Sequence, residues 1–136
     1  MGAWGPALFS DDTASDVRSE FTDHIGDGLS PDAATAKLLE DWQDTVADPD
    51  DGPVLWLALA STQWRLGRLL PEVQRRALEV IDQGLGLGRW NDDPKALAAR
   101  RVVLDKLRAT LLTSPPPPRR VPRRFRDSTT WSVGAV

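Results

Sequence analysis

The segment from Val54 to Leu66 is apolar on nearly every side of a helix, and it constrains the fold more than any other feature of the chain. At about 100° per residue, its large apolar side chains cannot share one face. They are Val54, Leu55, Trp56, Leu57, Leu59, Trp64 and Leu66. A helix of this kind is stable in water only when other elements cover it. The segment therefore predicts a helix in the middle of a bundle.

Four amphipathic segments supply the helices that would cover this central one. The apolar positions that share a face are Ala14, Val17, Phe21 and Ile25, then Leu38, Leu39, Trp42 and Val46, then Val73, Ala77, Val80 and Ile81, and finally Leu97, Leu104, Leu107 and Leu111. Their expected starts are Ser10, Ser30 with Pro31, Pro71, and Asp93 with Pro94. Because residues 1–113 contain no convincing period-two run, we predict an all-α domain, a compact bundle of about five helices.

A proline run marks the end of this helical domain. Residues 115–118 are four consecutive prolines, which favour an extended spacer. We therefore divide the chain into a helical domain at 1–113 and an extended Pro/Arg-rich tail at 114–136. Residues 129–136 could form a short β-strand around Trp131 and Val133. A lone strand has no partner, so this end docks on the bundle, pairs with another chain or begins a second domain.

Charges are sorted along the chain. Residues 1–53 carry two basic and thirteen acidic side chains, 2 − 13 = −11, whereas residues 54–113 carry ten basic and six acidic, 10 − 6 = +4. Residues 114–136 carry five arginines and one aspartate, again +4. The net charge of −3 therefore conceals an acidic half and a basic half. Such a separation can steer partners or fold the chain back on itself.

The carboxylates of the first expected helix form the strongest candidate for a binding surface. They recur at spacings of four, four, three and four, on the side away from Val17 and Phe21, and are Asp12, Asp16, Glu20, Asp23 and Asp27. Like charges four residues apart disfavour a helix by a few tenths of a kcal/mol per pair. Three interpretations stay open: an ordinary solvated face, a surface for a cationic protein partner, or a docking site for the arginines of the same chain.

A basic cluster in the tail supports a different hypothesis. Its arginines are Arg119, Arg120, Arg123, Arg124 and Arg126, beside Phe125. Clustered arginines next to an aromatic ring are what nucleic-acid binding uses. A sequence pI near 5.1 argues against it, because the acidic half would repel a phosphate backbone.

Several classes of chemistry lack their residues. The chain has no Cys and a single His, His24, so thiolate chemistry and His-based metal clusters are excluded, and we expect no cofactor, no metal site and no catalytic residue. A hydrolase with a carboxylate site that sequence cannot assemble is the remaining enzymatic alternative. The longest apolar run has seven residues, and the first nine lack Lys and Arg, so we expect a cytoplasmic protein without membrane association.

The N-terminus carries a recognisable motif. Residues 1–6 read MGAWGP and are followed by Phe9, Asp12, Ala14 and Asp16. This resembles the opening of a bacterial family of unknown function, MGAWG-x-x-x-F-x-x-D-x-A-x-D, in its longer, actinobacterial-type members. The resemblance implies no activity. We predict that Trp4 and Phe9 anchor the N-terminus on the bundle.

Together these patterns predict a non-catalytic protein–protein interaction module with an acidic helix face, in the manner of immunity or antitoxin proteins. The expected partner is another protein with a basic surface. The alternatives are a nucleic-acid-associated regulator that uses the arginine-rich tail and the hydrolase above. The oligomeric state is left open.

Overall fold

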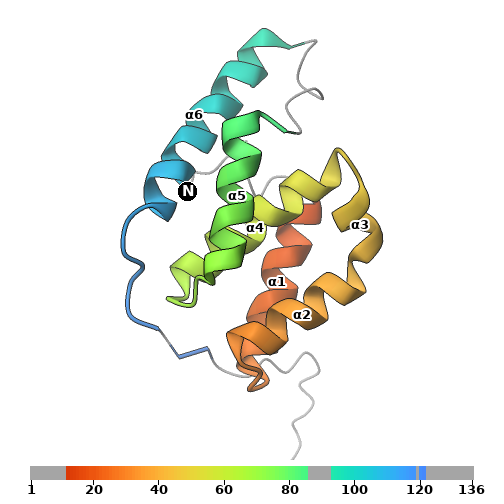
Figure 1. Cartoon of the computed structure of the whole chain (residues 1–136), viewed down its shortest axis with the longest axis vertical. Coiled ribbons are helices and arrows are strands. Elements are labelled where there is room, and N and C mark those ends of the chain that lie inside the picture. Colours follow the sequence, from red (N-terminus) through yellow and green to blue (C-terminus); the bar gives the residue numbers. More distant parts are fainter. Residues whose placement is uncertain (1–11, 86–92, 119, 122–136) are drawn as a thin grey trace, which may run out of the picture.

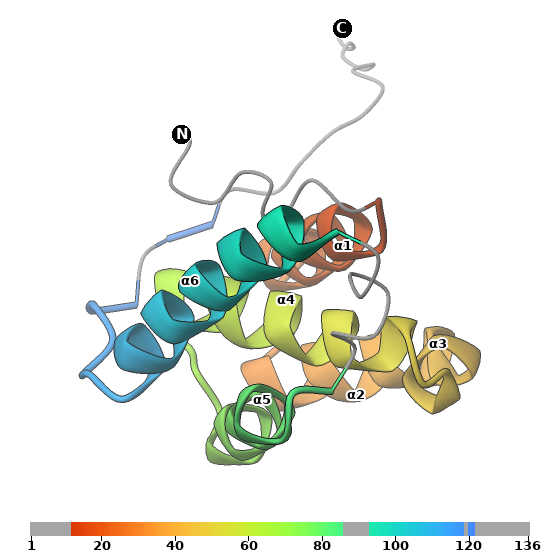
Figure 2. The same ribbon diagram turned by 90° about the horizontal axis from the view of Figure 1, so that it is seen from above.

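Helix α4 (Asp51–Arg65) lies at the centre of the computed structural model, which describes residues 12–85, 93–118, 120 and 121. Every residue from Gly52 to Gln63 except Trp56 is buried. Helix α4 packs most closely against α1 (Asp12–Gly26), α3 (Gln43–Ala47), α5 (Pro71–Gln83) and α6 (Pro94–Leu111). Figures 1 and 2 show these helices arranged around it. The predicted central helix is confirmed, and so is the all-α class, because the described residues contain six helices and no strand.

Helix α1 packs its predicted apolar stripe against α4. Ala14, Val17 and Phe21 have no exposed surface and Ile25 is 8% exposed, so the period of the stripe matches the contact. The helix ends at Gly26, and the chain turns at Gly28, where φ is +101°. There the backbone N–H of Leu29 donates to the carbonyl of His24, a Schellman closure.

The second predicted helix is divided into two. Helix α2 (Pro31–Asp41) begins as expected, with the Ser30 hydroxyl accepting the Ala33 N–H, and it ends at Asp41. Trp42 leaves the helical region with φ −110° and ψ 24°, and the short helix α3 follows. The expectation of one helix through Val46 was wrong because a kink at Trp42 lets α2 follow α1 while α3 packs against α4.

Helices α5 and α6 begin where the sequence predicted. Pro71 opens α5, and the Asp93 carboxylate caps α6 by accepting the Ala96 N–H at 3.0 Å. The buried residues of these helices are Val73, Ala77 and Val80 in α5 and Arg100, Val103, Leu104, Leu107 and Leu111 in α6. None of the described helices is long and apolar enough to cross a bilayer.

A buried amide joins three parts of the bundle. Gln63 in α4 has no exposed surface, and its Nε2 donates to Thr35 Oγ1 of α2 at 2.8 Å. Its Oε1 accepts the N–H of Leu70, the residue before α5, at 3.1 Å. Both ends of the amide are therefore satisfied, and α4 is fixed to α2 and to the start of α5.

The proline run lies along the turn between α4 and α5. Residues 114–118 have no regular secondary structure, consistent with the predicted extended segment. Gly67, with φ +73°, lies so close to them that a Cβ there would be 2.5 Å from the carbonyl oxygen of Pro116. The segment thus returns to the bundle. The predictions for the N-terminal anchor, the terminal strand and the other tail residues concern 1–11, 119 and 122–136, which lie outside the described residues.

Candidate functional site

The predicted carboxylate row lies on α1, on the side away from its buried stripe. Asp12, Asp16 and Asp27 are exposed, and Glu20 and Asp23 are half-buried. The spacing of four, four, three and four therefore places the row at the surface, as the sequence indicated.

The end of α2 turns this row into the wall of a groove. A hollow of about 570 Å³ is bounded by α1 on one side and by the last residues of α2 on the other. We call it the acidic groove, and its lining residues are Asp16, Ser19, Glu20, Asp23, His24, Asp27, Asp41 and Trp42. Five of these eight residues are carboxylic acids and none is Lys or Arg. Asp12 is not among them, so the groove takes up four of the five predicted acids and adds Asp41.

Glu20 is held in place at the floor of the groove. Its Oε1 accepts a hydrogen bond of 2.9 Å from the indole Nε1 of Trp42, and its Oε2 lies 3.3 Å from Nε2 of His24. The side chain of His24 is 13% exposed and that of Glu20 27%. Because both oxygens of Glu20 have partners within the chain, this carboxylate is a fixed charge. Asp16, Asp27 and Asp41 are the exposed acids of the groove, and Asp16 lies on α1 whereas Asp41 ends α2.

Three side chains of the groove converge as metal ligands do. Ligand atoms of Glu20, His24 and Asp41 all lie within 4.8 Å of one another. A mixed nitrogen and oxygen set of this kind is compatible with a divalent transition metal. The sequence argument considered only a straight row on one helix, in which ligands do not converge. The convergence arises because Asp41 comes from α2.

The groove does not assemble an activated nucleophile. Ser19 lines it, but the side-chain partner of His24 is Glu20, and in the described part of the chain no hydroxyl is hydrogen-bonded to this imidazole. A serine hydrolase needs a hydroxyl within reach of such a base. The described residues of the groove therefore do not form the hydroxyl–imidazole pair of a serine hydrolase.

Sequence reasoning missed four of the residues that line the groove: Ser19, His24, Asp41 and Trp42. Trp42 was assigned to the core by its helical spacing, and it does pack against the core as a half-buried residue. Its indole N–H donates to Glu20 of α1. Asp41 carried no usable signal, because the sequence predicted one helix through Val46 and so placed Asp41 in a helix interior.

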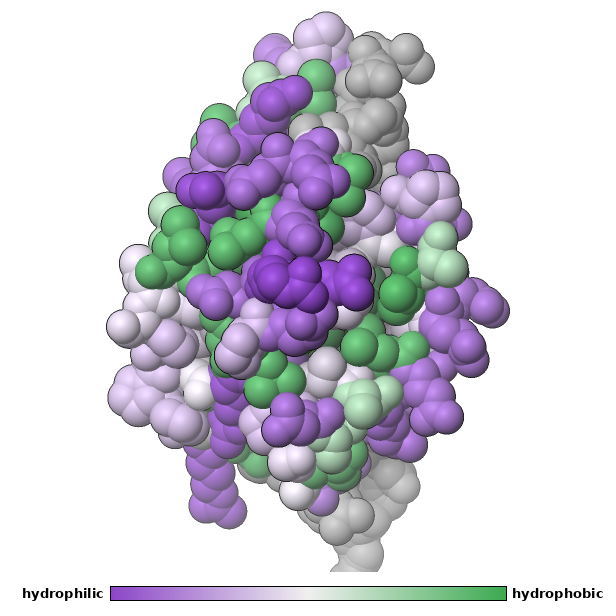
Figure 3. Space-filling model, in the orientation of Figure 1, coloured by the Kyte–Doolittle hydropathy of each residue, from purple (hydrophilic) through white to green (hydrophobic). Residues whose placement is uncertain are grey.

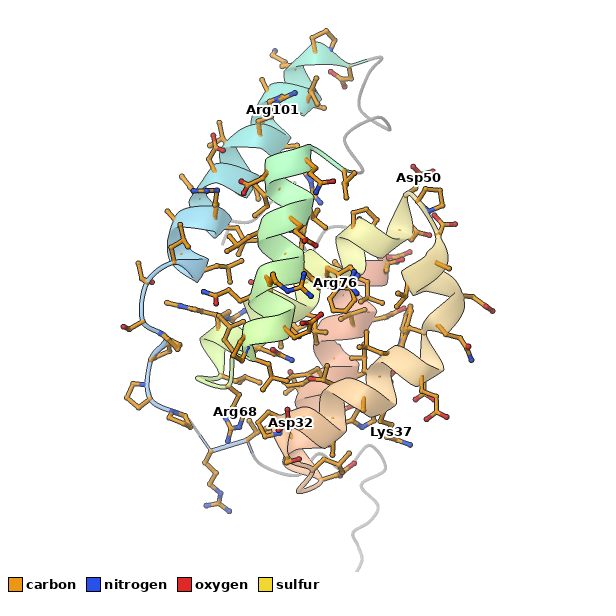
Figure 4. All side chains as sticks on the ribbon, in the orientation of Figure 1. Asp32, Lys37, Asp50, Arg68, Arg76 and Arg101 are labelled. Atoms are coloured by element: carbon orange, nitrogen blue, oxygen red, sulfur yellow. The ribbon has the colours of Figure 1, made fainter. Side chains whose placement is uncertain are left out.

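Charges on α5 and α6 are arranged differently, as ion pairs. Glu72 accepts hydrogen bonds from Arg75 at 2.6 Å and from Arg76 at 3.3 Å, and Asp82 accepts one from Arg108 of α6 at 2.8 Å. Figure 3 shows hydrophilic side chains gathered over α5. In Figure 4 Arg76 points from α5 toward α4, where its guanidinium lies 5.3 Å from the ring centre of Trp56.

These ion pairs shift the pKa values of three of their members. The hydrogen bond from Arg75 lowers the pKa of Glu72 below its ordinary value, and the same bond raises the pKa of Arg75. The pKa of Arg108 is raised by its hydrogen bond to Asp82. We call this set the paired-charge face, and it consists of Glu72, Arg75, Arg76, Glu79, Asp82 and Arg108.

Of the predicted basic cluster, only Arg120 falls within the described residues, and it is exposed. Arg119, Arg123, Arg124 and Arg126 lie outside them, as do Trp4 and Phe9. Docking of the tail on the acidic helix, nucleic-acid binding and the N-terminal anchor therefore all stay predictions.

Comparison with known proteins returned no match to a protein-family model, to a curated protein or to a solved structure. The resemblance of the N-terminal motif to a bacterial family stays a prediction as well.

Proposed function

We propose that this chain is a non-catalytic binding module whose acidic groove recognises a basic surface of another protein. The observation that carries the proposal is the composition of the groove: five carboxylic acids converge there from two helices, and no Lys or Arg lines it. Like charges held close together raise the free energy of the folded chain. Cationic side chains of a partner would relieve that cost on binding.

The geometry suits a partner that inserts Lys or Arg side chains. Asp16 on α1 and Asp41 on α2 are exposed and line the same hollow, so a cation in it would be attracted by acids of both helices. The fixed carboxylate of Glu20 adds charge at the floor without needing to reorganise. A surface of one sign also accelerates association by steering the partner in long-range encounters.

The mode of action follows from this charge pattern. A compact acidic protein that covers a basic surface is what immunity and antitoxin proteins are, and we place the chain in this functional type. We also propose that it acts in the cytoplasm, which is consistent with the absence of Cys from the sequence. Subcellular fractionation of the native host tests the location.

The groove is tested with two variants that lose the same charge. Asp16→Asn with Asp41→Asn removes one exposed acid from each wall. Asp44→Asn with Asp105→Asn removes two exposed acids of α3 and α6 that do not line the groove. Partners captured on the wild-type chain from host extract are identified by mass spectrometry, and their affinity for each variant is then measured by calorimetry.

We expect the groove variant to bind the captured partner at least tenfold more weakly at low salt, with the control variant close to wild type. The difference should shrink as ionic strength rises, because screening acts on the same charges. Equal affinity of the groove variant and the wild-type chain for every captured partner would exclude the proposal.

A further inference from the structure

A second hollow lies beside α1, on the other side of its buried stripe from the acidic groove. It measures about 150 Å³, and we call it the arginine pocket. Its lining residues are Arg18 and Thr22 of α1 and Thr62, Arg65 and Leu66 from the end of α4. At about 100° per residue, Arg18 points roughly 200° away from Asp16, so one helix presents anions to one side and a cation to the other.

Thr62 is the unusual residue of this pocket. It is 3% exposed, and its Oγ1 is buried without a hydrogen-bond partner. A buried hydroxyl without a partner costs about 1–3 kcal/mol, and such groups are rare in folded proteins. Because Thr62 lines the pocket, its unpartnered hydroxyl belongs to a residue of the pocket wall.

Two arginines line the same small space. Arg65 is exposed, and its guanidinium makes no ion pair or hydrogen bond with any described residue, although the chain is rich in acids. Arg18 is one of only two basic residues in the first 53 positions. An arginine fork matches the oxygens of an oxyanion.

Thr22 contributes to the wall. Its hydroxyl donates to the carbonyl of Arg18 at 2.7 Å, which fixes the side chain against its own helix. The free donors of the pocket are therefore those of Arg65 and the hydroxyl of Thr62.

We propose that the arginine pocket binds a small tetrahedral oxyanion of the phosphate or sulfate type. Arg65 and Arg18 supply positive charge, and Thr62 supplies the buried donor. The hollow measures about 150 Å³, which leaves room for a small ion. The site is separate from the acidic groove, so either proposal can fail without the other.

Inorganic phosphate is the first probe, titrated by calorimetry and by thermal unfolding against sodium chloride of equal ionic strength. The variants are Arg65→Gln and Thr62→Val. Thr62→Val keeps the volume and removes only the unpartnered hydroxyl, so in chloride it should be at least as stable as the wild-type chain. Arg101→Gln is the control, because Arg101 is exposed on α6 and does not line the pocket (Figure 4).

We expect phosphate to bind the wild-type chain and Arg101→Gln saturably and to raise their melting temperatures. Affinity should fall at least tenfold in Arg65→Gln and about three- to tenfold in Thr62→Val. Absence of saturable binding to the wild-type chain, or equal affinity in Arg65→Gln, would overturn the proposal. A parallel titration with O-phosphoserine distinguishes a free ion from the phosphoryl group of a larger ligand, because only a pocket that accepts a substituted phosphate would bind it as tightly.

Discussion

The acidic groove and the paired-charge face are both rich in carboxylates, but they balance charge in different ways. On the paired-charge face Glu72, Glu79 and Asp82 each form an ion pair with an arginine of the same chain. In the groove Asp16 and Asp41, from two different helices, line a hollow that no Lys or Arg lines. The comparison teaches that carboxylates on a helix need no partner from another molecule where arginines three or four residues away on the same helix can pair with them. The groove lacks such arginines, and for that reason it is the better candidate for recognition.

The largest effect is expected at the residue that joins the two regions. Gln63→Leu keeps the volume but leaves the N–H of Leu70 and the hydroxyl of Thr35 without their partner in α4. We expect a loss of about 2–4 kcal/mol in the free energy of unfolding. Urea denaturation measures it, with Gln43→Leu on the exposed surface of α3 as control. A loss under 1 kcal/mol would show that the amide does not couple the two regions.

A second, smaller loss is expected at the turn that supports the paired-charge side. In Gly67→Ala the new methyl would meet backbone atoms of Pro116, Pro117 and Pro118 at 2.5–2.7 Å, in addition to the strain of a positive φ. Gly28→Ala is the control, since φ there is +101° and nothing lies within 4 Å.

The positive φ alone should cost about 1–2 kcal/mol in both variants. The overlap with the proline segment should make Gly67→Ala about 1 kcal/mol or more worse than Gly28→Ala in thermal unfolding. Equal losses would mean that the proline segment does not pack on the turn in solution.

The groove wall itself is tested at Trp42. Trp42→Phe keeps an aromatic ring but removes the N–H that donates to Glu20 at 2.9 Å. A net loss of about 1 kcal/mol is expected for a hydrogen bond of this kind. A double-mutant cycle with Glu20→Ala isolates the pair, because alanine has no acceptor, and a coupling energy near zero would show that the indole does not hold the carboxylate.

Much of the fold follows from sequence periodicity, whereas the site depends on contacts that periodicity does not describe. The stripes of α1 and α6 and the burial of α4 were predictable because each rests on spacing within one helix. The kink at Trp42 was not, because it accompanies contacts between helices, with α2 following α1 and α3 packing against α4. The same holds for Asp41 and Thr62. The position of Asp41 beside His24 and the missing hydrogen-bond partner of Thr62 both depend on how neighbouring helices meet.

Neutralising one acid in each region should change the free energy of unfolding in opposite directions. Asp16→Asn removes repulsion from Asp12 and Glu20, four residues away on either side, and should raise the free energy of unfolding by about 0.2–0.5 kcal/mol. Asp82→Asn removes the partner of Arg108 and should lower it. Denaturation at low and high salt measures both changes, and each should shrink at high salt. Two changes of the same sign would remove the distinction between the regions.

The smallest effect is a pH dependence confined to the paired-charge face. The pKa of Glu72 is lower in the folded chain than its ordinary value, because Arg75 and then Arg76 bond to the charged carboxylate. A carboxyl group of this kind stabilises the fold above its unfolded pKa, and the contribution is lost as the pH falls through the lowered folded pKa. Glu72→Gln should therefore flatten the decline of stability below about pH 5. Arg75→Gln should flatten it as well, since it removes the largest cause of the shift. Stability is measured at each pH by urea denaturation monitored by circular dichroism. If stability falls equally with pH in both variants and in the wild-type chain, the ion pair does not form in solution. Because both side chains of the pair are more than half exposed, the acid slope attributable to it should also weaken with added salt.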